Sequence, residues 1–255
     1  MATKSLVQSQ FAASAEGYAT SRIHAEGPSL ARLIALTRPQ PQWRMLDIAT
    51  GPGHTAMAFA PHVAEVTATD LTPQMLKVAG GLAKKRGLAN ITFMEAAAES
   101  LPFPDGAFDL VTCRIAPHHF ADVKRFVAEA KRVLRPRGVF GLVDNISPDA
   151  PAAAEKHNAI EKLRDPSHGR CLPVGEWLQI VRSAGLVVRH SEVLPKEIEF
   201  DSWAERMQAA EEVRPAIKAL LRDPSPDLQA FLHTQERDGT MTFTIAEILL
   251  VATRV

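Results

Sequence analysis

The chain has 255 residues, of which 46% are hydrophobic and 23% are charged, the composition of an ordinary globular protein with one large core. Lysine plus arginine and aspartate plus glutamate number 29 each, so no overall charge draws the chain to nucleic acid or to an acidic membrane. Two cysteines, with no CxxC or HxxxH spacing, exclude a disulfide framework and give no sign of zinc.

The amino-terminal stretch MATKSLVQSQF lacks the apolar core of a signal peptide, and no run approaches the ~18 apolar residues of a membrane span. We therefore expect a cytoplasmic protein that does not insert into a membrane. No nucleic-acid partner is expected, and a homodimer is left open.

Segments typical of strands and of helices alternate from residue 44 onward. Strand patterns occupy residues 44–48, 64–69, 90–95, 108–113, 139–143, 186–193 and 242–251. Helical patterns occupy residues 53–60, 72–86, 122–134 and 176–184. Because strands that alternate with helices in units of about 30 residues need crossover connections, this order predicts a parallel sheet with helices on both faces.

Helix ends carry their usual signals. Thr72 is a good N-cap, and Pro73 fits the first turn of the helix that follows. Pro136 and Gly138 are expected to end the third helix, and Gly185 the fourth.

Two segments lie outside the alternation. Residues 1–40 look helical, with one break at Gly27-Pro28, and are expected to form a lid. Residues 41–255 would then form the main domain, interrupted at about 195–240 by a mostly helical insertion. That insertion either covers the mouth of a site or packs against a bare sheet edge.

A glycine-rich turn follows directly after the first strand, in MLDIATGPGHTAMAFA. In open sheets of this kind, ligands bind beyond the carboxyl ends of the strands, at the point where strand order reverses. The segment Gly51 to Ala56 formally matches the G-x-G-x-x-A of a dinucleotide site. A sulfonium donor such as S-adenosylmethionine needs the same close backbone approach, so the turn by itself leaves both ligands open.

Two aspartates lie at the ends of strands near this turn. Asp70 comes directly after the second strand, where two adjacent ribose hydroxyls would be good donors to its carboxylate. Asp47 either braces the turn or meets the donor's amino group. An unpaired carboxylate after a buried strand would be costly, which favours a ligand-binding role for Asp70.

Four segments, the glycine turn among them, resemble in order and spacing class I S-adenosylmethionine-dependent methyltransferases, in the branch that includes the ubiquinone/menaquinone-biosynthesis enzymes. They are LDIATGPGHTA, VTATDLTPQML, AAESLPFPDGAFDLVTCRIAPHHF and AKRVLRPRGVFGLVD. The likeness runs from about Phe11 to Val143. It implies a doubly wound, Rossmann-like, mostly parallel α/β sheet of seven strands with the last strand antiparallel.

The resemblance also implies which residues contact S-adenosylmethionine. Asp70 would hold the ribose diol, Leu71 would pack on the adenine, and the Ala98 N–H would meet a ring nitrogen. Relatives often carry aspartate where this chain has Ala97, so Glu99 or a water would have to replace it. The full implied set is Asp47, Ala49, Thr50, Gly51, Gly53, Asp70, Leu71, Met75, Ala97, Ala98, Glu99 and Arg114. Arg114 would lie near the methionine carboxylate, support the lid, or form a structural salt bridge.

The catalytic candidates are His119, Tyr18 and His118. The histidines follow the fourth strand, and neighbouring side chains point in different directions, so we expect only one of them to face the acceptor. His119 is favoured because the corresponding histidine of the similar phosphoethanolamine N-methyltransferases pairs with an N-terminal tyrosine over the donor. Tyr18 is the one tyrosine of this chain. A helix cap at His119 and a lid anchor at Tyr18 are the structural alternatives.

A metal-assisted mechanism is not expected. Asp144-Asn145 ends the fifth strand as in magnesium-dependent O-methyltransferases, but those enzymes also need a carboxylate where this chain has Arg114. Polar residues at 157–170, after the fifth strand, are expected either to contact an acceptor or to form ordinary ion pairs at the surface.

The sequence therefore predicts S-adenosylmethionine-dependent methyl transfer to an O, N or C atom of a small molecule by in-line displacement. The likeness slightly favours a phenol-like or quinol-like acceptor. Two alternatives stay open. One is a non-methylating descendant that retains the donor, such as a cyclase, a decarboxylase or a partner subunit. The other is an NAD-dependent oxidoreductase.

Overall fold

A computed structural model describes residues 6–12, 27–206 and 209–255. Its centre is one mixed sheet with strand order β3-β2-β1-β4-β5-β8-β6, and the short β7 pairs with β8 outside this path. The first five strands in this order are parallel, while β8 runs antiparallel to both β5 and β6. Strand order reverses between β1 and β4, which places the expected ligand crevice there. The strands are β1 (Arg44–Ile48), β2 (Glu65–Asp70), β3 (Ile91–Glu95), β4 (Phe108–Arg114), β5 (Leu134–Asn145), β6 (Leu186–Glu199), β7 (Gln235–Arg237) and β8 (Thr240–Arg254).

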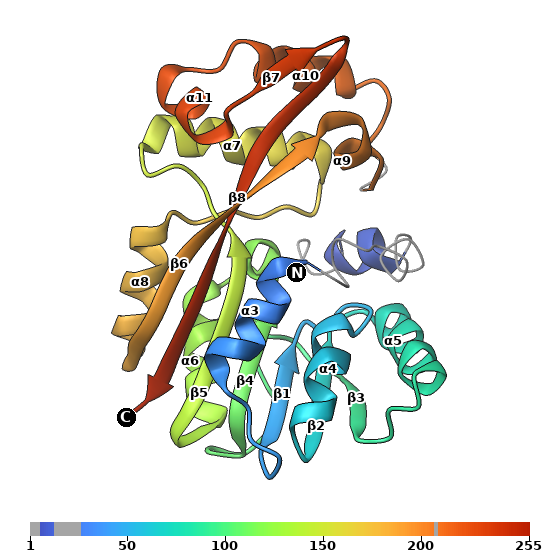
Figure 1. Cartoon of the computed structure of the whole chain (residues 1–255), viewed down its shortest axis with the longest axis vertical. Helices are drawn as coiled ribbons and strands as arrows, with labels where there is room; N and C mark the ends of the chain where they lie inside the picture. Colours follow the sequence, from blue (N-terminus) through green and yellow to red (C-terminus); the bar gives the residue numbers. More distant parts are fainter. Residues whose placement is uncertain (1–5, 13–26, 207–208) are drawn as a thin grey trace.

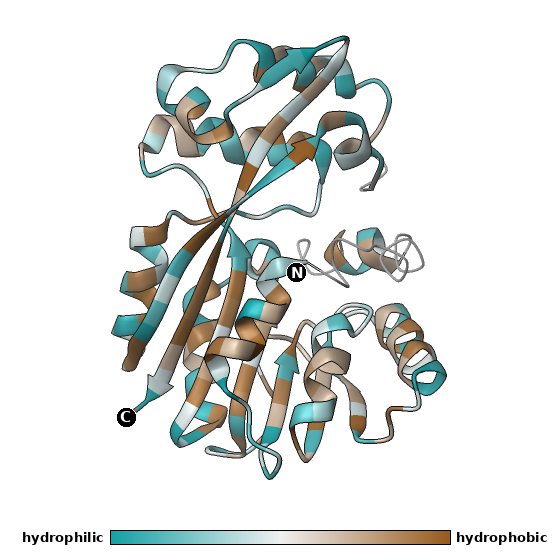
Figure 2. Cartoon of the chain, viewed as in Figure 1, coloured by the Kyte–Doolittle hydropathy of each residue, from teal (hydrophilic) through white to brown (hydrophobic). Residues whose placement is uncertain are grey.

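Helices cover both faces of the sheet, as predicted (Figure 1). The helices α3 and α4 share a buried apolar cluster with one face, and α6 and α8 share another with the opposite face. Figure 2 shows hydrophobic colour along the central strands, because strands buried on both sides have no solvent face. The helices are α3 (Pro28–Thr37), α4 (His54–Phe59), α5 (Pro73–Lys85), α6 (Val123–Val133), α7 (Pro151–Arg164), α8 (Val174–Ser183), α9 (Phe200–Arg206), α10 (Arg214–Arg222) and α11 (Pro226–Leu232), with 3-10 turns at Ala60–His62 and Pro117–His119.

The strands β6 and β8 continue past the end of β5 and carry a second lobe, which we call the cap. Pairing between them runs from Leu186–Arg254 to Glu199–Thr242, whereas β5 leaves the sheet at Asn145. The cap consists of these strand ends with α7, α9, α10, α11 and β7 (Figure 1). It has its own apolar core, which includes Trp203, Phe200 and Phe243.

Several predicted boundaries were wrong. The insertion expected at 195–240 begins with strand, because β6 runs on to Glu199, and it ends with β7. Pro136 and Gly138 lie inside β5 and do not end a helix, since α6 already stops at Val133. Thr72 makes no side-chain cap, and its N–H instead donates to Asp70.

Part of the predicted lid packs on the sheet. Leu30 and Leu33 of α3 are buried in the cluster that contains Met45 and Val143. Gly141 in β5 permits this approach, because an added Cβ would lie 3.0 Å from a methyl of Leu33 and 3.0 Å from a methyl of Thr37. Residues 28–37 are therefore attached to the core, and the domain bounds themselves stay a prediction.

Replacing Gly141 by alanine is expected to lower the free energy of unfolding by roughly 1–3 kcal/mol, because the new methyl group overpacks the α3–sheet contact. Gly175→Ala is the matched control, since a Cβ there meets nothing within 4 Å. Urea unfolding at unchanged slope measures both changes. Equal stability of the two variants would contradict the close packing of α3.

Candidate active site

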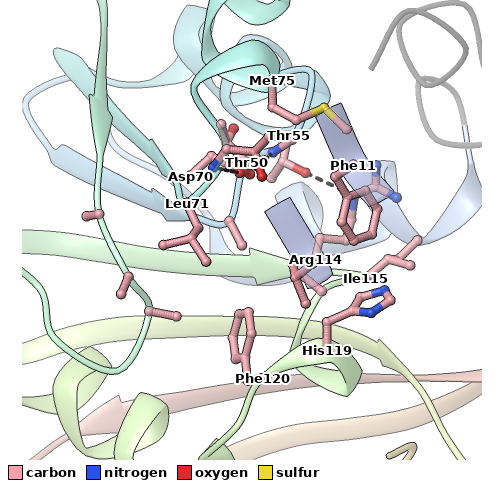
Figure 3. Close-up of a pocket in the computed structure, with 18 of the residues that line it drawn as sticks. Phe11, Thr50, Thr55, Asp70, Leu71, Met75, Arg114, Ile115, His119 and Phe120 are labelled. Carbon is pink, nitrogen blue, oxygen red and sulfur yellow. Dashed lines mark hydrogen bonds between the residues drawn. The ribbon is translucent and has the colours of Figure 1, made fainter. Parts of the chain in front are cut away.

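A cavity of about 1010 Å³, open to solvent at its mouth, lies at the carboxyl ends of β1, β2 and β4. We call it the first cavity. It sits at the predicted reversal of strand order, and its wall combines the glycine turn with side chains from the other strand ends. Figure 3 shows Asp70 and Leu71 on one side of this space and Phe11, Ile115 and His119 on another.

The glycine turn has left-handed backbone at Ala49, Gly51 and Gly53, with φ of 53°, 55° and 86°. A Cβ on Gly51 would meet nothing within 4 Å, and Gly51 lines the cavity. A Cβ on Gly53 would lie 3.0 Å from the Cβ of Ala79 in α5. The two glycines thus have different roles, because Gly51 keeps the cavity wall bare whereas Gly53 lets α5 pack on the turn.

Asp70 ends β2 with its carboxylate at the cavity wall. One oxygen accepts from the Gly51 N–H at 2.8 Å, and the other accepts from the Thr72 N–H at 2.8 Å. Burial raises the pKa of Asp70, and the hydrogen bonds from Thr72 and Gly51 oppose that rise. The Thr72 hydroxyl and the Leu71 N–H act on the same carboxylate. A ligand hydroxyl would therefore share or replace some of these donors at the cavity side.

Asp47 lies beneath the turn and does not line the first cavity. Its two oxygens accept from the hydroxyls of Thr50 at 2.6 Å and Thr112 at 2.7 Å. Burial raises the pKa of Asp47 to about 6, although these two hydrogen bonds act to lower it. Of the two interpretations from sequence, this geometry favours the brace over a ligand contact.

Most of the other residues expected to hold the donor do line the first cavity. They are Ala49, Thr50, Leu71, Met75, Ala97, Ala98, Glu99 and Arg114. Glu99 accepts from the Ala121 N–H at 3.1 Å, and Arg114 donates to the Thr55 hydroxyl at 3.0 Å. Burial lowers the pKa of Arg114, although the charges of Glu247 and Asp47 oppose that change.

The neighbouring histidines bond to different groups, but both line a second cavity that adjoins the first, whereas the sequence led us to expect only one on that side. His118 bonds through Nδ1 to Asp144 at 2.6 Å, and although burial opposes its charge, Asp144 leaves the pKa of His118 raised. His119 lines the first cavity, and burial followed by the charge of His118 holds its pKa well below the usual value. Its Nδ1 lies 3.2 Å from the Ser167 carbonyl and 3.3 Å from the Ser167 hydroxyl, which donates its own proton to Asp165. Because both oxygens then act as acceptors, we assign the proton to Nδ1 and the lone pair to Nε2.

The second cavity, of about 680 Å³, lies on the other side of His119, between the sheet and the cap. Both cavities share the wall formed by Phe11, Ile115 and His119. The second is rich in polar and charged groups: His118, Asn145, Glu161, Arg164, Asp165, His168, Lys196 and Glu247. Four members of the segment at 157–170 thus do face a cavity, whereas Arg170 pairs with Glu176 at the surface.

Sequence reasoning missed Phe11 and Ile115 as wall residues. Ile115 has φ of 54°, a conformation that β-branched residues rarely adopt, so nothing in the sequence announces the turn that directs it into the wall. Phe11 packs edge-on against His119 with ring centroids 4.9 Å apart. Tyr18, the proposed partner of His119, lies outside the described residues.

In the described ranges, no three histidine, cysteine, aspartate or glutamate side chains gather as a metal site requires. Asp144, the one carboxylate considered for a metal, is occupied by His118. Within the same part of the chain, no helix is both long and apolar enough to cross a membrane.

Residues 46–142 match the methyltransferase domain family. The uncharacterized methyltransferase YcgJ of Bacillus subtilis is 40% identical over 199 residues, which cover 78% of this chain and 79% of that protein. The chain belongs to the methyltransferase family. The crystal structure of YcgJ matches this methyltransferase with a TM-score of 0.84 and 36% identity, over 89% of this chain and 97% of the other.

A more distant relative is the ubiquinone/menaquinone biosynthesis C-methyltransferase UbiE of Brucella anthropi. It is 30% identical over 182 residues, which cover 68% of this chain and 66% of that protein. The predicted likeness to S-adenosylmethionine-dependent methyltransferases is therefore confirmed. Membership in this family disfavours the oxidoreductase that the six-residue glycine match had left open.

Proposed function

We propose that this methyltransferase binds S-adenosylmethionine in the first cavity and methylates an O, N or C atom of a small molecule held in the second. The observation that carries the proposal is the wall of Phe11, Ile115 and His119 that the two cavities share. Because the same residues border both cavities, the two spaces are adjacent, as they must be for a nucleophile in one to reach a methyl group held in the other. The proposed acceptor is a small molecule in the cytoplasm, with no nucleic-acid partner, and the protein acts as a monomer or a homodimer.

The residues of the first cavity fit the donor chemically. Gly51 leaves open space on the cavity side of the turn, and Asp70 offers its carboxylate for the ribose hydroxyls. Leu71 and Met75 supply apolar surface for the adenine, beside the strip at 97–99. When bound, the donor supplies an electrophilic methyl group on a sulfonium.

On the acceptor side, His119 is the proposed general base. The lowered pKa keeps the imidazole unprotonated near pH 7, so Nε2 carries the lone pair that a general base needs, although it is a weaker base than a free imidazole. Tyr18 is proposed to close over His119, and His118, bonded to Asp144, is proposed to contact the acceptor from the second cavity, which it lines. A base is needed only for acceptors that must lose a proton, so this role depends on the acceptor.

Calorimetric titration of the wild-type protein with S-adenosylhomocysteine and with NAD tests the donor site. We expect a dissociation constant in the micromolar range for S-adenosylhomocysteine and no heat from NAD. Tight NAD binding would contradict the proposal. Donor binding without methylated product from any acceptor class would instead point to the non-methylating alternative.

A further inference from the structure

The carboxylates around the second cavity differ in their partners. Three carboxylates line this cavity, Glu161, Asp165 and Glu247, together with the cations Arg164 and Lys196, and the charge of Arg114 also acts on Glu247. Glu161 accepts from Arg164 at 2.8 Å, and Glu247 lies 4.0 Å from Lys196. The fourth carboxylate of the region, Asp144, is paired with His118 just behind the wall.

Asp165 is the one of these three carboxylates that pairs with no lysine or arginine in the described part of the chain. It is 4% exposed, and one of its oxygens accepts from the N–H and the hydroxyl of Ser167 at 2.8 and 2.6 Å. Its second oxygen has only Nε2 of His119 nearby, at 3.9 Å, which is too long for a hydrogen bond. In the part of the chain that the structure describes, no lysine or arginine lies within 4.0 Å of it.

His119 does not neutralise this charge. Its proton is on Nδ1, toward Ser167, so the atom that faces Asp165 carries a lone pair. Two acceptors therefore face each other across 3.9 Å at the wall between the cavities. The group that complements two such acceptors is a hydrogen-bond donor with positive charge.

Resting on the proposed methyl transfer, we infer that the acceptor is a small amine whose ammonium group is bound by Asp165 and deprotonated by His119. The remaining wall suits a short apolar body on that amine, because Ile198, Trp203 and Ile245 line the same cavity. A neutral quinol would leave the buried charge of Asp165 without compensation, which is costly.

The step balances in atoms and electrons. The ammonium gives one proton to Nε2 of His119, and the amine lone pair then forms the bond to the methyl carbon. As that bond forms, the carbon–sulfur bond breaks, and its electron pair stays on sulfur as the neutral thioether of S-adenosylhomocysteine. The positive charge of the sulfonium ends on the methylated nitrogen, facing Asp165, and the proton on His119 leaves to solvent.

The test uses the full-length protein saturated with S-adenosylhomocysteine, titrated with primary amines that carry two- to eight-carbon alkyl or aryl bodies. Alcohols of the same skeleton and menadiol serve as comparisons, and product formation from S-adenosylmethionine is followed in parallel. We expect amines alone to bind and to be methylated. Asp165→Asn should weaken amine binding by roughly 30- to 1000-fold, as expected when one partner of a buried charge pair is lost.

Glu176→Gln is the matched control, because this exposed carboxylate pairs with Arg170 outside the cavity and should leave amine binding unchanged. Asp165→Asn should also keep its S-adenosylhomocysteine affinity and its unfolding midpoint. Three results would each overturn the inference. The wild type could bind menadiol or the alcohols more tightly than the amines, Asp165→Asn could lose affinity for amines and alcohols equally, or no amine could bind. Failure of the wild type to bind S-adenosylhomocysteine would instead count against the proposed function.

Discussion

Replacing Asp70 by asparagine is expected to weaken S-adenosylhomocysteine binding by about 100-fold, which corresponds to about 2.7 kcal/mol. The carboxylate accepts from the N–H groups of Gly51 and Thr72 and is proposed to accept from the ribose hydroxyls as well. Hydrogen bonds to a charged group contribute about 1.5–3 kcal/mol each, so losing the charge affects several contacts at once. Asparagine also turns an NH₂ toward groups that are themselves donors. Isothermal calorimetry at fixed salt measures the change.

Asp109→Asn is the matched control for this variant. Asp109 is also buried and also accepts from a backbone N–H, that of Arg44 at 2.7 Å, but it stands near the amino end of β4, away from the cavity. We expect Asp109→Asn to lose stability and to keep its affinity for S-adenosylhomocysteine within about twofold. If Asp70→Asn bound as tightly as Asp109→Asn, Asp70 would only brace the turn.

The donor side of this protein could be predicted from sequence because its determinants are local. A buried strand followed by glycine, or by aspartate, places a functional group at the carboxyl end of a parallel sheet, whatever the rest of the fold does. The turn at Gly51 and the carboxylate of Asp70 lie 19 positions apart, yet each is positioned by the strand just before it. Both residues therefore line the first cavity, as the sequence motifs predict.

The acceptor side could not be predicted in the same way. His119 and Asp165 face each other only because the loop after α7 returns against the turn after β4, where Gly169 and Arg170 donate to the His118 carbonyl. The side of the second cavity that the cap forms depends on how far β6 and β8 extend beyond β5. An alternation of hydrophobic residues predicts that a strand is present but does not predict where it ends. The unexpected backbone at Ile115 is decided by tertiary packing as well.

Trp203→Ala is expected to have the largest effect on stability, roughly 3–5 kcal/mol, because it empties the centre of the cap core. The indole is 1% exposed, and it packs edge-on against Phe243 with centroids 5.0 Å apart. The guanidinium of Arg164 lies 4.5 Å from its ring centroid, which adds a cation–π contact. Trp177→Ala is the matched control, since that indole, carried by α8, is fully buried in the core on the sheet.

The two variants should differ in what they damage. The first cavity is built on the sheet, whereas Trp203 lines only the second, so Trp203→Ala should keep S-adenosylhomocysteine affinity within about threefold while amine binding is lost. Trp177→Ala should weaken both together. Calorimetry with each ligand, alongside limited proteolysis of the cap, separates these cases.

How the cap melts follows from the strands that it shares with the sheet. Since β6 and β8 pair without interruption from one core to the other, apart from one irregularity between Val188 and His190, the wild type should unfold in a single transition. Removing the indole weakens only the far end of this ladder, so Trp203→Ala should show an earlier loss of cap structure while the sheet persists. If both tryptophan variants lost donor binding equally in one transition, the two cores would form one cooperative unit. The second cavity could then not open without disturbing the first.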